Sequence, residues 1–331
     1  MSLLRFVKMH GLGNDYVYVD GHAQSLDGFD RPRLAREISD RHRGVGGDGL
    51  ILILPPSPGV DADVRMEMYN ADGSRGEMCG NGIRCVARYA VEQGLVRRRD
   101  GEGAADRRSS PARAAKPSPL PTEMNAAMAM LGETLGVREI GNVDLRIETD
   151  RGVLDLVAFT ADGVVRSVRV NMGPPILEPG RIPVAMDADR CIRQSIRVEQ
   201  LEFNVTCVSM GNPHAVVFVD DVRAFDLAKW GPLFEHHKLF PRRINLHVAQ
   251  RLSRGEARMR TWERGTGMTQ ACGTGACAVL VAGVLENRLD RTALLHLPGG
   301  ELRIEWPAED APVFMTGPAE ECFRGEWHGR R

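Results

Sequence analysis

The chain has 331 residues, of which 43% are hydrophobic and 26% charged, and its formal net charge is −1. These values are ordinary for a globular protein with room for two domains, and they exclude a fibrous or wholly disordered chain. The balanced charge gives no overall attraction for nucleic acid. The longest nearly apolar run, residues 276–285, is about half as long as a membrane span requires, and residues 1–10 lack the apolar core of a signal peptide.

The predicted elements are many short strands and few helices. A helix is expected over residues 33–41, because Asp30 suits its cap and Pro32 its first turn. Alternation of apolar and polar residues with period two is typical of half-buried strands. Strands are expected over residues 50–54, 64–68, 143–147, 153–159, 164–170, 201–208, 257–261, 302–306 and 322–327.

Two motifs occur twice in the same order. Residues 13–20 resemble residues 211–220, and the pattern Cys-Gly-x-Gly occurs at 79–82 and again at 272–275. The spacing between the two motifs is similar in both copies, which indicates one ancestral unit used twice. Each Cys-Gly-x-Gly is followed by an apolar stretch of helical character.

The duplication predicts the fold class. We expect an α+β, or mixed α/β, protein of two pseudo-symmetric lobes, each a mostly antiparallel sheet wrapped around a central helix. The N-terminal lobe is expected over residues 1–142, the C-terminal lobe over 143–320, and residues 321–331 are expected to form a strand that returns to the N-terminal lobe. The starts of the two central helices are expected to face the gap between the lobes.

Residues 97–142 break the pattern. They contain no aromatic residue, begin with three arginines and include the run Pro117-Ser118-Pro119-Leu120-Pro121. We interpret this segment as an inserted, solvated linker, in which residues 122–135 could form a short helix.

The two repeated cysteines carry the clearest chemical signal. Cys79 and Cys272 precede predicted helices, where unpaired N–H groups and the helix dipole favour a thiolate and allow ionisation closer to neutral pH. A matched pair of such thiols suits a reaction that removes a proton from one face of a carbon and returns one to the other. The hypothesis is a racemase or epimerase that needs no cofactor.

Three features of the sequence suggest other functions. Gly44 to Gly49 form a glycine-rich segment, but it follows a helix and precedes a strand, the reverse of a dinucleotide-binding motif, so a turn is expected. The cysteines in and after the repeats lack zinc-ligand spacing, so no metal is expected. A thiol hydrolase or transferase stays open, in which His214 would be the base for a nucleophilic cysteine and Glu263 would orient it.

The motifs resemble the diaminopimelate epimerase family. The similarity runs through residues 8–15, 70–74, 78–85, 210–214, 263–267 and 271–275, short segments whose positions span most of the chain outside the 97–142 segment. The family fold of two similar lobes agrees with the duplication. The resemblance implies that Cys79 and Cys272 are the catalytic acid/base pair, one thiolate and one thiol, and that L,L-diaminopimelate is converted to the meso form, a precursor for lysine and peptidoglycan synthesis.

The resemblance also implies the other site residues. The backbone N–H groups of Gly80, Asn81, Gly273 and Thr274 would bind the reacting carboxylate. The second amino-acid end of the substrate would be held by Asn14, Asn70, Asn212, Asn245 and Arg264. His214 and Glu263 would orient the cysteines or bind the reacting ammonium group. At Gly49, where some relatives carry a polar side chain, one substrate contact would be missing or supplied by water.

No pyridoxal phosphate or metal is expected. The expected partner is a small-molecule substrate, with no nucleic acid or membrane, and a homodimer is the candidate assembly. The seven cysteines are odd in number and do not form a secreted disulfide pattern, so a cytoplasmic protein with reduced thiols is expected. The alternative within this chemistry is a racemase of another amino acid.

Overall fold

The computed structural model describes residues 2–76, 78–97 and 140–329, which fall into two compact units. The first unit comprises residues 1–11, 15–170 and 318–331, and the second comprises residues 12–14 and 171–317. The predicted linker lies mostly outside the described residues, and so does the helix expected at 122–135. No helix within the described ranges is long and apolar enough to cross a membrane.

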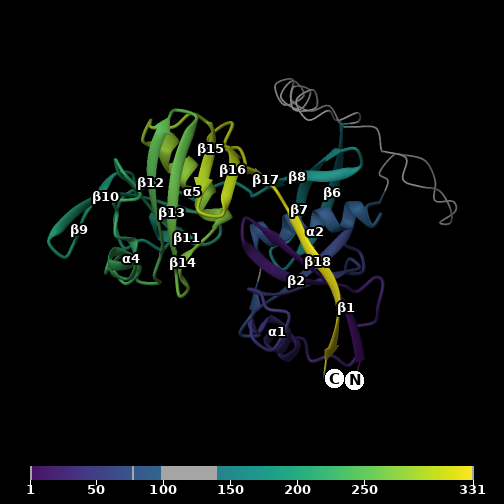
Figure 1. Cartoon of the computed structure of the whole chain (residues 1–331). Coiled ribbons are helices and arrows are strands. Elements are labelled where there is room, and N and C mark those ends of the chain that lie inside the picture. The colour runs from purple at the N-terminus through teal and green to yellow at the C-terminus, as the bar shows by residue number, and fades with distance from the viewer. Residues whose placement is uncertain (1, 77, 98–139, 330–331) are drawn as a thin grey trace. The chain divides into compact units, whose positions relative to one another are not determined.

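The first unit is a strand-rich α+β unit (Figure 1). Its elements are β1 (Ser2–Gly11), β2 (Asn14–Asp20), α1 (Arg31–Ser39), β3 (Gly49–Leu54), β4 (Val64–Asn70), β5 (Arg75–Gly76), α2 (Gly80–Glu92), β6 (Ile140–Thr149), β7 (Gly152–Ala161), β8 (Val164–Asn171) and β18 (Glu320–Gly329).

The second unit has the same character. Its elements are η1 (Pro179–Arg181), β9 (Gln194–Val198), β10 (Leu201–Ser209), β11 (Pro213–Phe218), α4 (Leu227–Glu235), β12 (Asn245–Ser253), β13 (Glu256–Glu263), β14 (Gly267–Thr269), α5 (Gly273–Leu285), β15 (Thr292–Leu297), β16 (Gly300–Glu305) and β17 (Phe314–Gly317).

The strand pairings repeat from one unit to the other. In the first unit β2 and β3 are parallel, β3 and β4 antiparallel, β4 and β6 parallel, and β6 to β8 form an antiparallel meander. In the second unit β11 and β12, β12 and β13, β13 and β15, and β15 to β17 follow the same sequence of directions. A helix connects each parallel pair, as parallel strands require. The duplication and the mixed α+β fold predicted from the sequence are confirmed.

The expected boundary between the halves differs from the observed one. The first unit continues to Val170, because β6 pairs with β4 and its hairpins with β7 and β8 keep residues 140–170 with the first sheet. Residues 140–142 accordingly belong to β6 and not to a linker. At the other end, β18 pairs antiparallel with β1 over its whole length and lies in the first unit.

The local signals placed most elements well. The helix expected at 33–41 is α1, where the Asp30 side chain accepts from the Arg33 N–H as an N-cap. All nine expected strands lie in or across observed strands. Helix α4 was not predicted, because Pro232 lies inside it and proline ordinarily ends a helix.

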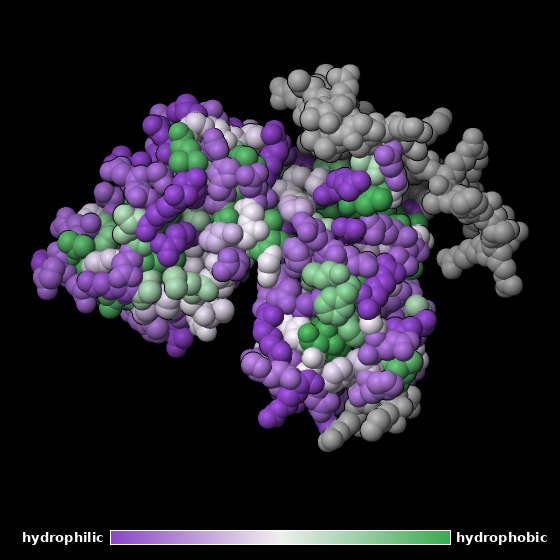
Figure 2. All heavy atoms as spheres, in the orientation of Figure 1, coloured by the Kyte–Doolittle hydropathy of each residue, from purple (hydrophilic) through white to green (hydrophobic). Residues whose placement is uncertain are grey.

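Each unit encloses its central helix. Helix α5 packs against β10, β11, β12, β15, β16 and β17, and α2 packs against β1, β4, β6 and β7. Val279, Leu280 and Val281 are wholly buried, and each contributes on the order of 2 kcal/mol by burial. The visible surface of each unit is mostly hydrophilic, with apolar residues gathered over β18 of the first unit (Figure 2).

Candidate functional site

Cys79 is the N-cap of α2. Its extended backbone directs the side chain back over the first turn, where Sγ accepts a hydrogen bond from the Gly82 N–H at 3.3 Å. The Asn81 N–H and the Tyr16 side chain also hydrogen-bond to the cysteine. This local structure follows from the sequence, because Gly80 and Gly82 place no side chain of their own over the first N–H groups of the helix.

The expectation that Cys79 ionises closer to neutral pH is wrong. Burial raises the pKa of the Cys79 thiol above its ordinary value, and this effect outweighs the hydrogen bonds from the Gly82 and Asn81 N–H groups and from Tyr16 and the charge of Arg84, which all lower the pKa. Cys79 is therefore a thiol at neutral pH, the form that donates a proton.

Tyr16 is a site residue that the sequence analysis missed. It lies on β2 directly opposite Gly49 on β3, and it is 5% exposed. A Cβ at residue 49 would lie 2.9 Å from Cε1 of Tyr16 and 2.1 Å from the carbonyl oxygen of Tyr69. Gly49 thus leaves room for the Tyr16 ring. The alignment of the two repeats was a usable signal, because Tyr16 in the first repeat aligns with His214 in the second.

Asn70 and Asn81 are the remaining predicted residues of the first unit. Asn70 ends β4, where its backbone pairs with Gly49 and its Nδ2 donates to the Ser74 hydroxyl at 2.9 Å. Asn81 lies in the first turn of α2 and is 3% exposed. The first unit therefore brings together Cys79, Gly80 and Asn81, with Asn70 on β4 directly across from Gly49 on β3.

Cys272 is the N-cap of α5 and is 5% exposed. Its Sγ lies 3.6 Å from the Thr274 hydroxyl oxygen. That hydroxyl accepts a hydrogen bond from Asn212 Nδ2 at 3.3 Å. The second unit therefore places Asn212, Thr274 and Cys272 in one hydrogen-bonded series.

The series continues into the protein interior. Asn212 Oδ1 lies 3.0 Å from Nε2 of His214, and Nδ1 of His214 lies 2.8 Å from Nε2 of His247. Nδ1 of His247 in turn lies 3.0 Å from the Thr261 hydroxyl. His247 and Thr261 face each other across the β12–β13 pair. Neither residue was singled out by the sequence analysis, because nothing local distinguishes them from core positions.

Both histidines are neutral. Burial lowers the pKa of His247 to about 3. Burial also holds the pKa of His214 well below its ordinary value, and the neighbouring His247 and Arg264 lower it further. A neutral imidazole has one donor and one acceptor nitrogen, so each ring donates a hydrogen bond to one neighbour and accepts one from the other.

Asn245 holds the loop that carries Arg264. Its Nδ2 donates to the Pro213 carbonyl at 2.8 Å, and its Oδ1 accepts from the Arg264 backbone N–H at 2.9 Å. The Arg264 guanidinium donates to the Arg242 carbonyl at 3.0 Å. Glu263 accepts from the Thr269 hydroxyl at 2.6 Å.

The predicted site residues are divided between the two units. Cys79, Gly80, Asn81 and Asn70 belong to the first unit. The second unit holds Asn14, Asn212, His214, Asn245, Glu263, Arg264, Cys272, Gly273 and Thr274. Each of the seven cysteines, all within the described ranges, carries a free thiol.

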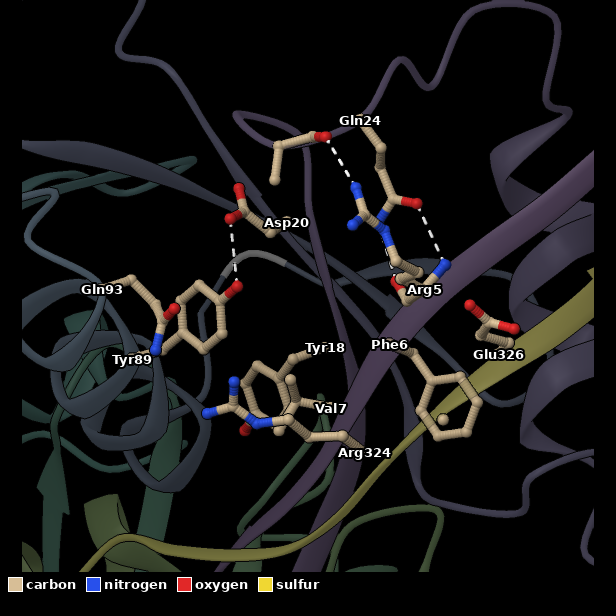
Figure 3. A pocket seen from close by; sticks show the side chains of 12 residues that line it. Arg5, Phe6, Val7, Tyr18, Asp20, Gln24, Tyr89, Gln93, Arg324 and Glu326 are labelled. Carbon is tan, nitrogen blue, oxygen red and sulfur yellow. Dashed lines mark hydrogen bonds between the residues drawn. The ribbon is translucent and has the colours of Figure 1, made fainter.

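A cavity of about 470 Å³ lies within the first unit (Figure 3). Its lining comes from β1, β2, α2 and β18 and includes Arg5, Asp20, Tyr89 and Arg324. The Tyr89 hydroxyl donates to Asp20, and Arg5 exchanges hydrogen bonds with Gln24. None of the predicted site residues lines this cavity, so it is not the candidate site.

The match to known proteins covers nearly the whole chain. A family model described as diaminopimelate epimerase matches residues 6–102 and 206–321. A diaminopimelate epimerase from Agathobacter rectalis is 44% identical over 330 residues, which cover 98% of this chain and 99% of the relative. One from Acetivibrio thermocellus is 42% identical and covers 98% of each chain.

Solved structures with low sequence identity share the fold. A hydroxyproline epimerase from Agrobacterium vitis aligns with a TM-score of 0.59 at 14% identity, over 99% of this chain and 91% of that one. A PhzF-family protein from Bacillus anthracis aligns with a TM-score of 0.61 at 14% identity, over 99% of this chain and 100% of that one. These structures share the arrangement of elements in which the two cysteine-capped helices lie.

Proposed function

The chain belongs to the diaminopimelate epimerase family, and we propose that it converts L,L-diaminopimelate to meso-diaminopimelate with two cysteines as acid and base. It is an isomerase. The observation that carries the mechanism is the repeated setting of Cys79 and Cys272, each the N-cap of a buried helix of 13 residues in a unit with the same strand order. A two-base epimerisation requires two such groups.

The thiolate of one cysteine removes the α-proton, and the thiol of the other delivers a proton to the opposite face of the same carbon. The roles exchange in the reverse direction. Burial raises the pKa of the Cys79 thiol and so favours its role as the proton donor, which it has in one of the two directions. In that direction Cys272 starts as the thiolate.

The negative charge that develops next to the carboxylate needs stabilisation, because we propose that neither pyridoxal phosphate nor a metal takes part. The first turns of α2 and α5 offer backbone N–H groups at Gly80, Asn81, Gly273 and Thr274. Such N–H groups, held in place before the reaction, favour the enolate-like transition state without any reorganisation.

The distal amino-acid end of the substrate is assigned to asparagines and an arginine. Asn14, Asn70, Asn212, Asn245 and Arg264 supply donors and acceptors for one ammonium and one carboxylate group. The hydrogen bonds that Asn245 makes to the Pro213 carbonyl and the Arg264 N–H support a role in shaping the loop of Arg264. A racemase of a simple amino acid would leave this polar set without a ligand group.

The hydrolase alternative loses support at His214. A base for a nucleophilic cysteine needs a ring nitrogen directed at the sulfur, but the His214 nitrogens are engaged by His247 and Asn212. Glu263, the proposed orienting group, accepts from Thr269. A stable acyl-enzyme with an ester or amide substrate would reverse this preference.

Location and assembly are part of the proposal. Seven free thiols suit a reducing compartment, and we assign the protein to the cytoplasm. We expect a homodimer, for which Leu3 and Phe323, each 49% exposed on the paired strands β1 and β18, offer apolar area. Light scattering coupled to size exclusion measures the mass directly.

The decisive experiment is incubation of the purified chain with L,L-diaminopimelate in heavy water without added cofactor. We expect the meso form to appear with deuterium at one α-carbon, and Cys79→Ala or Cys272→Ala to abolish both. Cys322→Ser, which changes an exposed cysteine, is the matched control and should turn over at the wild-type rate. Full turnover in either alanine variant would refute the two-thiol mechanism.

A further inference from the structure

The hydrogen-bonded series that ends at Cys272 has a defined direction. We propose that His247 and Thr261 are positioning residues for Cys272, although neither touches it. They set the direction of every hydrogen bond along the series, so that the Thr274 hydroxyl keeps its proton for the cysteine sulfur. This proposal rests on the acid/base role of Cys272 given above.

The orientation of the Asn212 amide is the central step. Its Oδ1 faces His214 and its Nδ2 faces Thr274. An amide oxygen can only accept, so His214 must carry its proton on Nε2 and accept at Nδ1. At the other end, the amide donates to the Thr274 oxygen, whose own proton then remains available to a thiolate 3.6 Å away.

The interior end of the series enforces the same direction. Because His214 accepts at Nδ1, His247 must donate from Nε2 and accept at Nδ1 from the Thr261 hydroxyl. Thr261 is 3% exposed, and within the part of the chain that the structure describes its hydroxyl hydrogen-bonds to His247. In the reverse direction its hydroxyl would accept and leave its own buried proton without an acceptor, which costs free energy.

The reverse direction would also remove the hydrogen bond that Thr274 offers to Cys272. With the proton of His214 on Nδ1, the Asn212 amide would turn its Nδ2 to the ring and its oxygen to Thr274. The Thr274 hydroxyl would then donate to that oxygen, and the thiolate would lose the hydrogen bond. The direction set by His247 and Thr261 therefore decides whether the Thr274 hydroxyl stabilises Cys272 as a thiolate.

Only the second unit has space for an imidazole ring at the position of His247. His247 lies on β12 opposite Val216, the position that Ile51 occupies on β3 opposite Tyr18 in the first unit. A Cβ on Gly275 would lie 2.2 Å from Cε1 of His247, and a Cβ on Gly82 would lie 2.7 Å from Cδ1 of Ile51. Equivalent glycines thus admit an imidazole in one unit and a methyl group in the other.

The direction is tested by ¹⁵N nuclear magnetic resonance of the histidine rings in the full chain at pH 7. Both His214 and His247 should be neutral, with the proton on Nε2 and a deprotonated Nδ1. Assignment uses the His214→Gln and His247→Gln variants. A protonated Nδ1 on His214, or an imidazolium at either residue, overturns the proposal.

The consequence for the sulfur is tested by alkylation with iodoacetamide as a function of pH, read by peptide mass spectrometry. His247→Ile installs the residue of the equivalent position and should raise the pH midpoint of Cys272 by about half a unit. Cys79 in the same molecule is the internal control and should keep its midpoint. His247→Gln retains a donor near Nε2 and should remain close to the wild type.

A second pair of variants covers the case in which His247→Ile fails to fold. Thr261→Val keeps the shape and removes the hydroxyl, and Thr261→Ser keeps the hydroxyl. The valine variant should shift the Cys272 midpoint and the serine variant should not. An unchanged Cys272 midpoint in the valine variant, or an equal shift at Cys79, contradicts the proposal. Alkylation needs no turnover, so these outcomes are independent of whether the epimerase reaction is established.

Discussion

The close approach of Gly275 to His247 predicts that Gly275→Ala damages the second unit, whereas Gly82→Ala is tolerated by the first. A Cβ at residue 275 would lie 2.2, 2.7 and 2.8 Å from Cε1, Nδ1 and Nε2 of the His247 ring. Because ordinary carbon contacts begin near 3.5 Å, the ring must move by about 1 Å. Its hydrogen bonds of 2.8 and 3.0 Å to His214 and Thr261 cannot survive that shift.

The magnitude follows from these contacts. Two buried hydrogen bonds contribute about 1 kcal/mol each, and overpacking a core costs about 1–3 kcal/mol. Alanine returns about 1 kcal/mol of helix propensity relative to glycine. We therefore expect Gly275→Ala to lose about 2–4 kcal/mol of unfolding free energy. For Gly82→Ala the nearest atom is Cδ1 of Ile51 at 2.7 Å, the end of a flexible side chain, so the net change should lie within about 1 kcal/mol of zero.

Urea unfolding measures the total change, and hydrogen exchange read by peptide mass spectrometry assigns it to one unit. Gly275→Ala should speed exchange in β12 and α5 and leave β3 and α2 unchanged. It should also lower turnover, because the hydrogen-bonded series to Cys272 is broken. Equal stability of the two alanine variants, or a loss in Gly275→Ala that spares β12, would refute the packing argument.

Three further predictions concern the two cysteines and the buried His247. Tyr16→Phe removes a hydrogen bond to Cys79 and should raise the pH midpoint of Cys79 alkylation and lower kcat/KM about tenfold, whereas Tyr18→Phe should leave that midpoint in place. The pKa of His247 is lowered to about 3 from the usual 6.5, so between these pH values the folded state binds fewer protons than the unfolded state. The free energy of unfolding should therefore fall as the pH is lowered from 6.5 towards 3. His247→Gln should flatten this slope by about 1 kcal/mol per pH unit in urea titrations. If the proposed two-thiol mechanism holds, mild oxidant should join Cys79 to Cys272 and stop turnover until a reductant is added. An oxidised enzyme that stays fully active with no crosslinked peptide contradicts that mechanism.

Local patterns were sufficient to predict most of the secondary structure. Alternation located strands such as β4 and β13, and the Asp30 cap with Pro32 located α1. These signals act over a few residues and therefore survive without knowledge of the fold. The same rules missed α4, because the packing of Trp230 and Phe234 into the core outweighs the proline within that helix.

The ends of the units were decided by pairing over long distances in the chain. Val64 pairs with Ile147 in the parallel β4–β6 contact, and this pairing keeps the β6–β8 meander in the first unit. No composition change marks that contact, so the sequence placed the boundary at the atypical segment 97–142 instead.

The sequence by itself determined the duplicated fold and the two cysteines at helix starts, because repeated motifs and helix caps are written in neighbouring residues. Only the tertiary structure decided what surrounds each sulfur. Burial raises the pKa of Cys79 against the effect of its helix, and strand register brings His247 beneath His214, thirty-three residues apart, to direct the hydrogen bonds towards Cys272. Burial and register depend on residues distant in the chain, and no local pattern encodes them.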